Sequence, residues 1–297
     1  MSNLILNFKF GQKRFLDQCH DSNLLIYGPS NLNVEQDIEN DLFRQFNFVF
    51  IHNGMLEVLK SRIPDIKSLK LIHVLNGSYS TKYKEKILAD DHLINMYLVS
   101  EVHTMRVLSS YGISQKKIMH MTLNYEQFGV NGWPTMGPKL LMFIEFYKIK
   151  FRRLLISGYT FYMNADLLTN TYHLDYPDYK NLFDVYERRL KPRQNRSVKN
   201  LTEEEKTALI KCAQQQRIAL DKTSVSRTGH SIYQGYNVFL RFYRKNRSRV
   251  DIDSPLTEIM TTYPVPILDN FDLIPSWVLT SEVNLAVVTT NGPRTNF

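Results

Sequence analysis

Short polar segments rich in glycine, asparagine and serine interrupt the apolar runs of this sequence. A glycine lets a ligand approach the backbone closely, while asparagine and serine side chains exchange hydrogen bonds with a base, a ribose or a phosphate. In open α/β sheets, ligands bind outside the carboxyl ends of the strands. These segments are therefore the first candidates for a binding site, with plain turns as the alternative interpretation. They are Gly28-Pro29-Ser30, His52-Asn53, Asn76-Gly77-Ser78 and residues 157–162, Ser-Gly-Tyr-Thr-Phe-Tyr.

Candidate metal ligands and nucleophiles are sparse. Asp251-Ile252-Asp253 has the Asp-x-Asp spacing that many sugar-nucleotide enzymes use for a divalent ion, but such triplets are frequent by chance. Asp90-Asp91-His92 and His120 offer too few ligands for a site. The chain carries neither a Gly-x-Ser-x-Gly elbow nor a Gly-rich dinucleotide or Gly-Lys-Ser/Thr phosphate loop. We therefore predict no metal site and no covalent nucleophile.

Apolar runs that stop at turn residues predict the strands that carry these segments. Such runs cover residues 23–27, 46–51, 69–75 and 94–99, and helical candidates at 34–45, 54–61 and 101–111 separate them. This alternation predicts an α/β fold, with a Rossmann-like, mostly parallel sheet and helices on both of its faces. A helix at 139–150 opened by Gly137-Pro138, a strand at 153–157, a helix at 232–245 and a strand at 249–252 continue the pattern.

A polar stretch interrupts this alternation and predicts an inserted helical lid. Residues 164–229 are dominated by Asn, Asp, Tyr, Lys, Arg and Gln, with helical candidates at 179–190 and, after a Thr202–Glu205 capping box, at 203–219. We therefore divide the chain into a Rossmann-like core at 1–163, an inserted lid-like subdomain at 164–229, and a return to the core followed by a C-terminal tail at 230–297.

Composition limits the class of protein. The chain has 297 residues, and 37 Lys and Arg against 29 Asp and Glu give a formal net charge of +8. Hydrophobic residues make up 43% and charged residues 22%, which excludes a disordered chain, a collagen and a coiled-coil rod. Two cysteines are too few for a disulfide framework. Because no apolar window reaches the ~18 residues of a spanning helix and basic residues follow the first apolar patch, we expect a cytoplasmic protein.

Basic residues concentrate in two stretches, at 188–199 and 241–249. Such runs suit an anionic lipid surface, a nucleic acid or a phosphorylated substrate, and they are also typical of a solvated face.

The motifs occur in an order that resembles the bacterial sialyltransferases of glycosyltransferase family 42. Residues 155–162, Leu-Ile-Ser-Gly-Tyr-Thr-Phe-Tyr, match the Ser-Gly-Ile-Asp-Phe-Tyr signature of that family, with Thr160 in place of the acid. Residues 172–175, Tyr-His-Leu-Asp, resemble the Tyr-x-x-Asp of the family's flexible lid. Gly229-His230-Ser231 matches its Gly-His-Ser, and the helix, strand and proline expected after that motif follow here. The resemblance covers about residues 23–260, as short motifs in order.

This resemblance implies an inverting transfer of sialic acid, or of a related acidic sugar such as Kdo, from its cytidine monophosphate (CMP) donor, without metal or cofactor. The variant of the GT-A fold found in that family would be the scaffold, with residues 1–163 as the nucleotide-sugar-binding core and residues 164–229 as a lid on the acceptor side. His230, preferred over His173 because of the Gly-His-Ser match, would be the general base, since an imidazole with an ordinary pKa of ~6.5 can be a neutral base at working pH. Tyr162 and Tyr172 would hydrogen-bond the departing phosphate. The implied donor-binding residues are Gly28, Ser30, Asn31, Asn53, Asn76, Thr135, Gly137, Ser157, Gly158, Thr160 and Phe161.

The chain also departs from the family. Trp133 stands about where an acceptor-binding arginine is expected, and Met136 replaces the serine before the helix glycine. The resemblance implies a cell-surface glycan or glycolipid acceptor, as in a capsule or lipooligosaccharide, an enzyme that rests peripherally on the inner membrane, and no nucleic-acid partner. A homo-oligomer is compatible with the sequence. Two alternatives stay open: a magnesium-dependent pterin or nucleotide diphosphokinase, and a non-catalytic basic module that binds nucleotides or nucleic acid.

Overall fold

The computed structural model describes residues 13–29, 33–52, 54–128, 130, 134–159, 161, 204 and 232–262. These residues belong to two compact units. The first unit comprises the described parts of 1–124, 136–159 and 242–256, and the second those of 125–135, 160–241 and 257–297.

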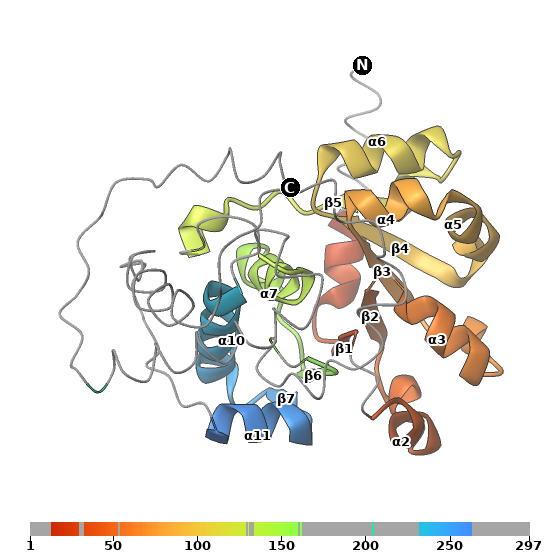
Figure 1. Ribbon diagram of the computed structural model, residues 1–297. Coiled ribbons are helices and arrows are strands. Elements are labelled where there is room, and N and C mark those ends of the chain that lie inside the picture. The colour runs from red at the N-terminus through yellow and green to blue at the C-terminus, as the bar shows by residue number, and fades with distance from the viewer. Residues whose placement is uncertain are drawn as a thin grey trace, which may run out of the picture. The chain divides into compact units, whose positions relative to one another are not determined.

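A parallel seven-stranded sheet forms the centre of the first unit (Figure 1). The strand order is β5-β4-β3-β2-β1-β6-β7, and all six neighbouring pairs are parallel. The predicted α/β, Rossmann-like fold is therefore confirmed. The strands are β1 (Asn23–Tyr27), β2 (Phe48–His52), β3 (Leu71–Leu75), β4 (Ile94–Val99), β5 (Ile118–His120), β6 (Arg153–Ser157) and β7 (Val250–Ile252).

The strand order reverses direction at β1. From β1 the chain proceeds outward through β2, β3, β4 and β5, and then returns to place β6 on the other side of β1. In register, Tyr27 at the end of β1 lies opposite Ser157 at the end of β6. The carboxyl ends of β1 and β6 are thus the topological switch point, which is where open α/β sheets bind their ligands.

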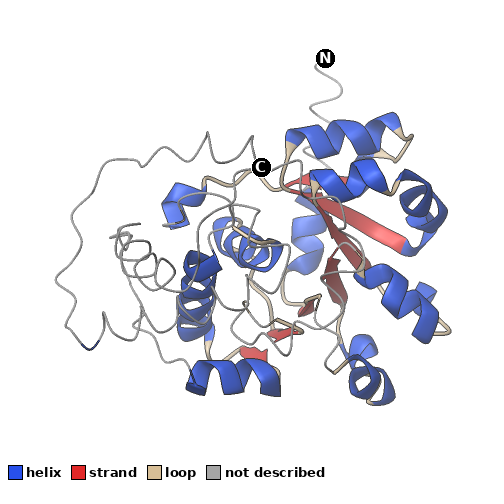
Figure 2. Cartoon of the chain, viewed as in Figure 1, coloured by secondary structure: helices blue, strands red, loops and turns tan. Residues whose placement is uncertain are grey.

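Helices connect the strands, as Figure 2 shows. Short 3₁₀ turns complete the connections at Leu42–Gln45, Ile66–Ser68, Asp91–Leu93, Gln115–Lys117 and Tyr125–Phe128. The helices are α2 (Val34–Glu39), α3 (Met55–Arg62), α4 (Gly77–Lys82), α5 (Lys84–Asp90), α6 (Val102–Ser110), α7 (Met136–Phe146), α10 (Ile232–Asn246) and α11 (Ser254–Thr262). None of the helices within the described residues is long and apolar enough to cross a membrane.

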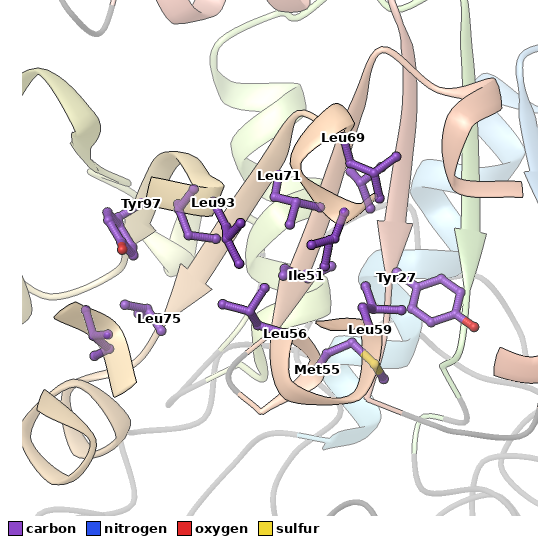
Figure 3. Packing of buried hydrophobic residues seen from close by; sticks show 14 of the residues in the cluster. Tyr27, Ile51, Met55, Leu56, Leu59, Leu69, Leu71, Leu75, Leu93 and Tyr97 are labelled. Atoms are coloured by element: carbon purple, nitrogen blue, oxygen red, sulfur yellow. The ribbon is translucent and has the colours of Figure 1, made fainter. Parts of the chain in front are cut away.

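Both faces of the sheet are buried. On one face, alternate strand residues such as Tyr27 and Ile51 pack with Met55, Leu56 and Leu59 of α3 in a single apolar cluster (Figure 3). The intervening strand residues are also buried, and Phe48 of β2 meets the ring of Phe15 from the helical residues 13–19 at a centroid distance of 6.0 Å. Burial on both sides explains why the strands read as continuous apolar runs.

Some predicted boundaries were wrong for local reasons. The helix expected at 34–45 breaks after Glu39, because Asp41 adopts a left-handed conformation with φ of 52° before the 3₁₀ turn. The helix expected at 139–150 begins at Met136, which places Pro138 in a first turn that needs no N–H donor there, and it ends at Phe146. Strand β5 was missed because three residues carry too little periodicity. Apart from Glu204, the predicted lid helices lie outside the described residues.

Candidate functional site

The loops after β1 and β6 touch each other at the switch point. The Gly28 N–H donates to the Ser157 carbonyl oxygen over 2.7 Å. A Cβ atom on Gly28 would overlap the carbonyl group of Gly158, and Gly158 itself has a φ of +74°. The two backbones can therefore approach this closely only because both positions are glycine.

The ring of Tyr159 closes this junction. It lies against Gly28 and against Gly137 in the first turn of α7, where a Cβ atom would overlap the ring. The Tyr159 hydroxyl forms a hydrogen bond with Nε2 of His52, the last residue of β2. One buried tyrosine thus joins the ends of β1, β2 and β6 to the start of α7.

His52 is held as a neutral imidazole. Burial lowers its pKa to about 3, with a further contribution from the nearby His73 on β3. At neutral pH this ring carries no charge and serves as a hydrogen-bond partner of Tyr159. Its pKa is too low for an efficient general base at that pH.

Acid pH is expected to destabilise the protein through His52. Its pKa of about 3 in the folded state returns to about 6.5 on unfolding, so below pH 6.5 the unfolded state binds a proton that the folded state does not. Stability is therefore lost as the pH falls from 6.5 toward 3, by ~2 kcal/mol at pH 5. Urea unfolding at pH 7.5 and 5 should show this loss in the wild type and not in His52→Gln.

Two carboxyl groups in this region change the pH dependence of stability in the direction opposite to His52. The pKa values of Asp37 and Asp253 are raised, mainly by burial, so these carboxyls add stability as the pH falls. Both remain in His52→Gln, and the comparison of the two proteins isolates the imidazole. His103→Gln, an exposed histidine on α6, is the matched control and should keep the wild-type pH dependence. Equal pH dependence in the wild type and His52→Gln would contradict the assignment.

Asp253 anchors the loop after β6. Its Oδ2 accepts hydrogen bonds from the Ser157 hydroxyl at 3.1 Å and from the Gly158 N–H at 2.7 Å. Its Oδ1 accepts from the Leu256 N–H at 3.0 Å and so caps the start of α11. Burial raises the pKa of this carboxyl, although these three bonds oppose the shift. Asp253 therefore fixes the backbone that faces Gly28.

The two carboxylates of the Asp-x-Asp triplet have separate partners. Asp251 points to the exposed surface and pairs with Arg153 of β6 at 2.5 Å, whereas Asp253 is turned toward Ser157 and Gly158. Within the described residues, no group of three or more His, Cys, Asp or Glu side chains gathers in a way that could hold a metal ion.

A second carboxyl lies beside the end of β1. Oδ2 of Asp37 on α2 accepts a hydrogen bond from the Tyr27 hydroxyl over 2.6 Å. Burial raises the pKa of Asp37, and the negative charge of Asp253 raises it further. This side of the junction thus presents oxygen acceptors, which suit hydroxyl donors.

Lys139 is a buried cation at the same edge of the sheet. It lies in the first turn of α7, and its Nζ donates to the Ser100 hydroxyl, just after β4, over 3.2 Å. Burial lowers the pKa of this amine to about 8, and the charge of Glu101 opposes the shift. An ammonium near the positive end of a helix is unfavourable, so its partners at the end of β4 must compensate.

The structure gives local roles to the predicted donor-binding residues that it describes. Asn76 caps α4, since its Oδ1 accepts from the Tyr79 N–H at 2.8 Å. Ser157 bonds Asp253, while Gly28, Gly137 and Gly158 make the close contacts around Tyr159. In the second unit, Thr135 directly precedes α7, and the Phe161 ring packs on Tyr236 and Phe239 of α10 at 5.4 and 4.9 Å. Outside the described residues lie Ser30, Asn31, Asn53, Thr160, Tyr162, Tyr172, His173 and His230.

Comparison of the chain with protein-family models, curated proteins and solved structures finds no significant match.

Sequence reasoning placed Tyr159 in the segment 157–162 and Asp253 in an Asp-x-Asp triplet without predicting the contacts of either, and it missed Lys139. Tyr159 and Asp253 carry no local signal, because their partners lie about a hundred residues away in the chain. Lys139 does carry a local signal. It is the single cation in the buried run from Gly137 to Ile144, whose other members are apolar. A lone charge in a helix that is apolar all round indicates a buried polar contact.

Proposed function

We propose that this protein is an inverting glycosyltransferase that moves sialic acid, or a related acidic sugar such as Kdo, from CMP to a cell-surface glycan. The observation that carries the proposal is the contact of the Gly28 and Gly158 backbones at the topological switch point. These two loops are the ones that the motif resemblance assigns to the donor. Support therefore comes from two independent sources, sequence order and sheet topology.

The described residues around this junction suit a nucleotide. Gly28 itself is buried and its N–H bonds the Ser157 carbonyl oxygen, while Pro29 and Gly158 stay partly exposed at this edge, where a phosphate or ribose could approach the backbone. Asn76 caps its helix through Oδ1, so its amide N–H groups would face a ribose or base. The N-terminus of α7 favours an anion. Because residue 137 in the first turn of this helix is glycine, the ring of Tyr159 fits against that turn. Asp37 offers an acceptor for a ribose hydroxyl.

The proposed chemistry needs a base and a stabiliser of the leaving group. His230 would deprotonate the acceptor hydroxyl as that oxygen attacks the anomeric carbon of the donor sugar, and the bond to the CMP phosphate breaks. Tyr162 and Tyr172 would donate hydrogen bonds to the departing phosphate, a role that requires no change in their own protonation. These three assignments come from the motif resemblance.

A thermal-shift panel tests the donor class. CMP is expected to raise the melting temperature without magnesium, because a ligand that binds only the folded state stabilises it by about 2.7 kcal/mol at 100 times its Kd. UMP, GDP and ATP at the same concentration should have smaller effects. Turnover of CMP-sialic acid or CMP-Kdo should survive excess chelator.

Two outcomes would overturn this function. A shift that requires ATP with magnesium would support the diphosphokinase alternative. Salt-sensitive binding of polyanions without turnover of any CMP-sugar would support a non-catalytic binding module.

A further inference from the structure

Two basic segments far apart in the sequence meet at the amino edge of β6 and β7. One is the connection from α7 to β6, and the other is the end of α10 with its turn into β7, as the course of the chain in Figure 1 shows. Both belong to the first unit. This is the edge opposite the glycine junction, because the strands are parallel.

Packing and hydrogen bonds join the two segments. Lys245 forms an ion pair with Glu145 of α7. The Arg249 guanidinium lies 5.0 Å from the ring centroid of Phe151 and donates to the Phe151 carbonyl oxygen at 3.3 Å. The rings of Phe151 and Phe242 stack at 6.2 Å. The two segments therefore form one continuous surface.

Exposed cations dominate this surface, which we call the basic edge. Its described acidic side chains are Glu145, Asp251 and Asp21. Glu145 pairs with Lys245, and Asp251 pairs with Arg153. Asp21 is joined to this surface by its backbone N–H, which donates to the Lys150 carbonyl oxygen. The basic residues, all exposed, are Lys148, Lys150, Arg152, Arg153, Arg244, Lys245, Arg247 and Arg249. Within the described residues, Lys148, Lys150, Arg152 and Arg247 form no ion pair, so cations outnumber the carboxylates of this surface.

A large apolar side chain is exposed beside these cations. Phe146, the last residue of α7, keeps 42% of its surface accessible. Among the described residues the other exposed large apolar side chains, Leu88 and Val102, lie on α5 and α6. Phe146 lies two residues before Lys148 and next to Glu145, which pairs with Lys245. An exposed aromatic ring on the same surface as lysines and arginines combines the two interactions that hold a protein on an anionic bilayer.

We propose that the basic edge binds the surface of a membrane that contains anionic phospholipids. The lysine and arginine heads would contact lipid phosphates, and the Phe146 ring would enter the boundary between headgroups and acyl chains. A nucleic-acid duplex fits less well, because its outer surface of phosphates offers no apolar layer for the exposed Phe146 ring to enter. This proposal does not depend on the glycosyltransferase function.

The proposed orientation has a consequence for the glycine junction. Five-residue strands such as β6 span ~17 Å at about 3.3 Å per residue, so the junction would stand at least that far from the lipid headgroups. A membrane-bound acceptor would then have to extend its reacting group away from the bilayer.

Vesicle co-sedimentation of the full chain tests the proposal. The wild type should bind vesicles of phosphatidylcholine with 30% phosphatidylglycerol, release them as salt rises, and leave pure phosphatidylcholine unbound. The variant K148Q/K150Q/R152Q should lose affinity roughly 100-fold, because each cation near an anionic surface contributes about fivefold. Phe146→Ser should weaken binding most at intermediate salt, where the charge contribution is partly screened and the wild type still binds. Thermal unfolding checks that each variant is folded, and R244Q/R247Q replaces the triple variant if that one is not.

The matched control removes three other lysines. K82Q/K84Q/K86Q changes the net charge equally, but on α4 and α5, where the three amines lie over the rings of Tyr83 and Tyr111. This control should retain most of the wild-type affinity. Equal losses in both triple variants would overturn the proposal, since net charge alone would then explain binding. Failure to bind anionic vesicles, or tight binding of an RNA oligonucleotide in their place, would overturn it as well.

Discussion

Replacing His230 by alanine is expected to slow sugar transfer by about 10²–10⁴-fold, the usual contribution of a positioned general base. CMP binding should change little, because in the proposed mechanism the imidazole acts on the acceptor hydroxyl and not on CMP. The measurements are kcat with CMP-sialic acid and a glycan acceptor, together with the thermal shift produced by CMP.

Two other histidines provide the comparison for this prediction. His173→Ala should keep turnover within a few-fold of the wild type, because the Gly-His-Ser motif assigns the base to position 230. His52 cannot take over the role at neutral pH, since its pKa of about 3 makes it too weak a base and its ring is buried against Tyr159. Near-normal turnover in His230→Ala would show that the base is another residue, and a large loss in His173→Ala would identify which one.

Much of the fold follows from local sequence signals. The strands β1 and β6 lie at the residues expected for them, 23–27 and 153–157, because strands buried on both faces need continuous apolar runs and these runs end at Gly28 and Gly158. Their adjacency could not be predicted, since it pairs residues about 130 positions apart and no local pattern encodes that pairing. The switch point is therefore a property of topology.

The site, like the fold, combines features that have local sequence signals with features that depend on long-range contacts. Turn chemistry is local, so Gly28, Gly137 and Gly158 could be singled out from the sequence. The reason for the three glycines could not, because it depends on the Tyr159 ring that lies against Gly28 and Gly137. Tyr159 stands where the family signature has isoleucine, and only the structure brings its hydroxyl to His52. Each interaction that fixes the loops is therefore a long-range contact.

Replacing Asp253 by alanine is expected to lower the free energy of unfolding by about 3–5 kcal/mol. The substitution leaves the Gly158 and Leu256 N–H groups and the Ser157 hydroxyl without their acceptor, at about 1–3 kcal/mol for a buried group. It also removes the cap of α11, which contributes about 1 kcal/mol. Urea unfolding measures the loss, and CMP should bind more weakly because Gly158 is no longer held against Gly28.

Asp251 is the matched control, because it belongs to the same Asp-x-Asp triplet. Its carboxylate forms an ion pair with Arg153 in which both side chains are about half exposed, at 52% each, and such pairs contribute about 0–1 kcal/mol. Asp251→Ala should therefore lose less than ~1 kcal/mol. A divalent ion held jointly by the triplet would produce a different result: magnesium would stabilise the wild type, and both variants would lose that stabilisation equally. Unequal losses that do not respond to magnesium would identify Asp253 as a structural anchor of the Ser157–Gly158 loop, and similar losses in the two variants would contradict that role.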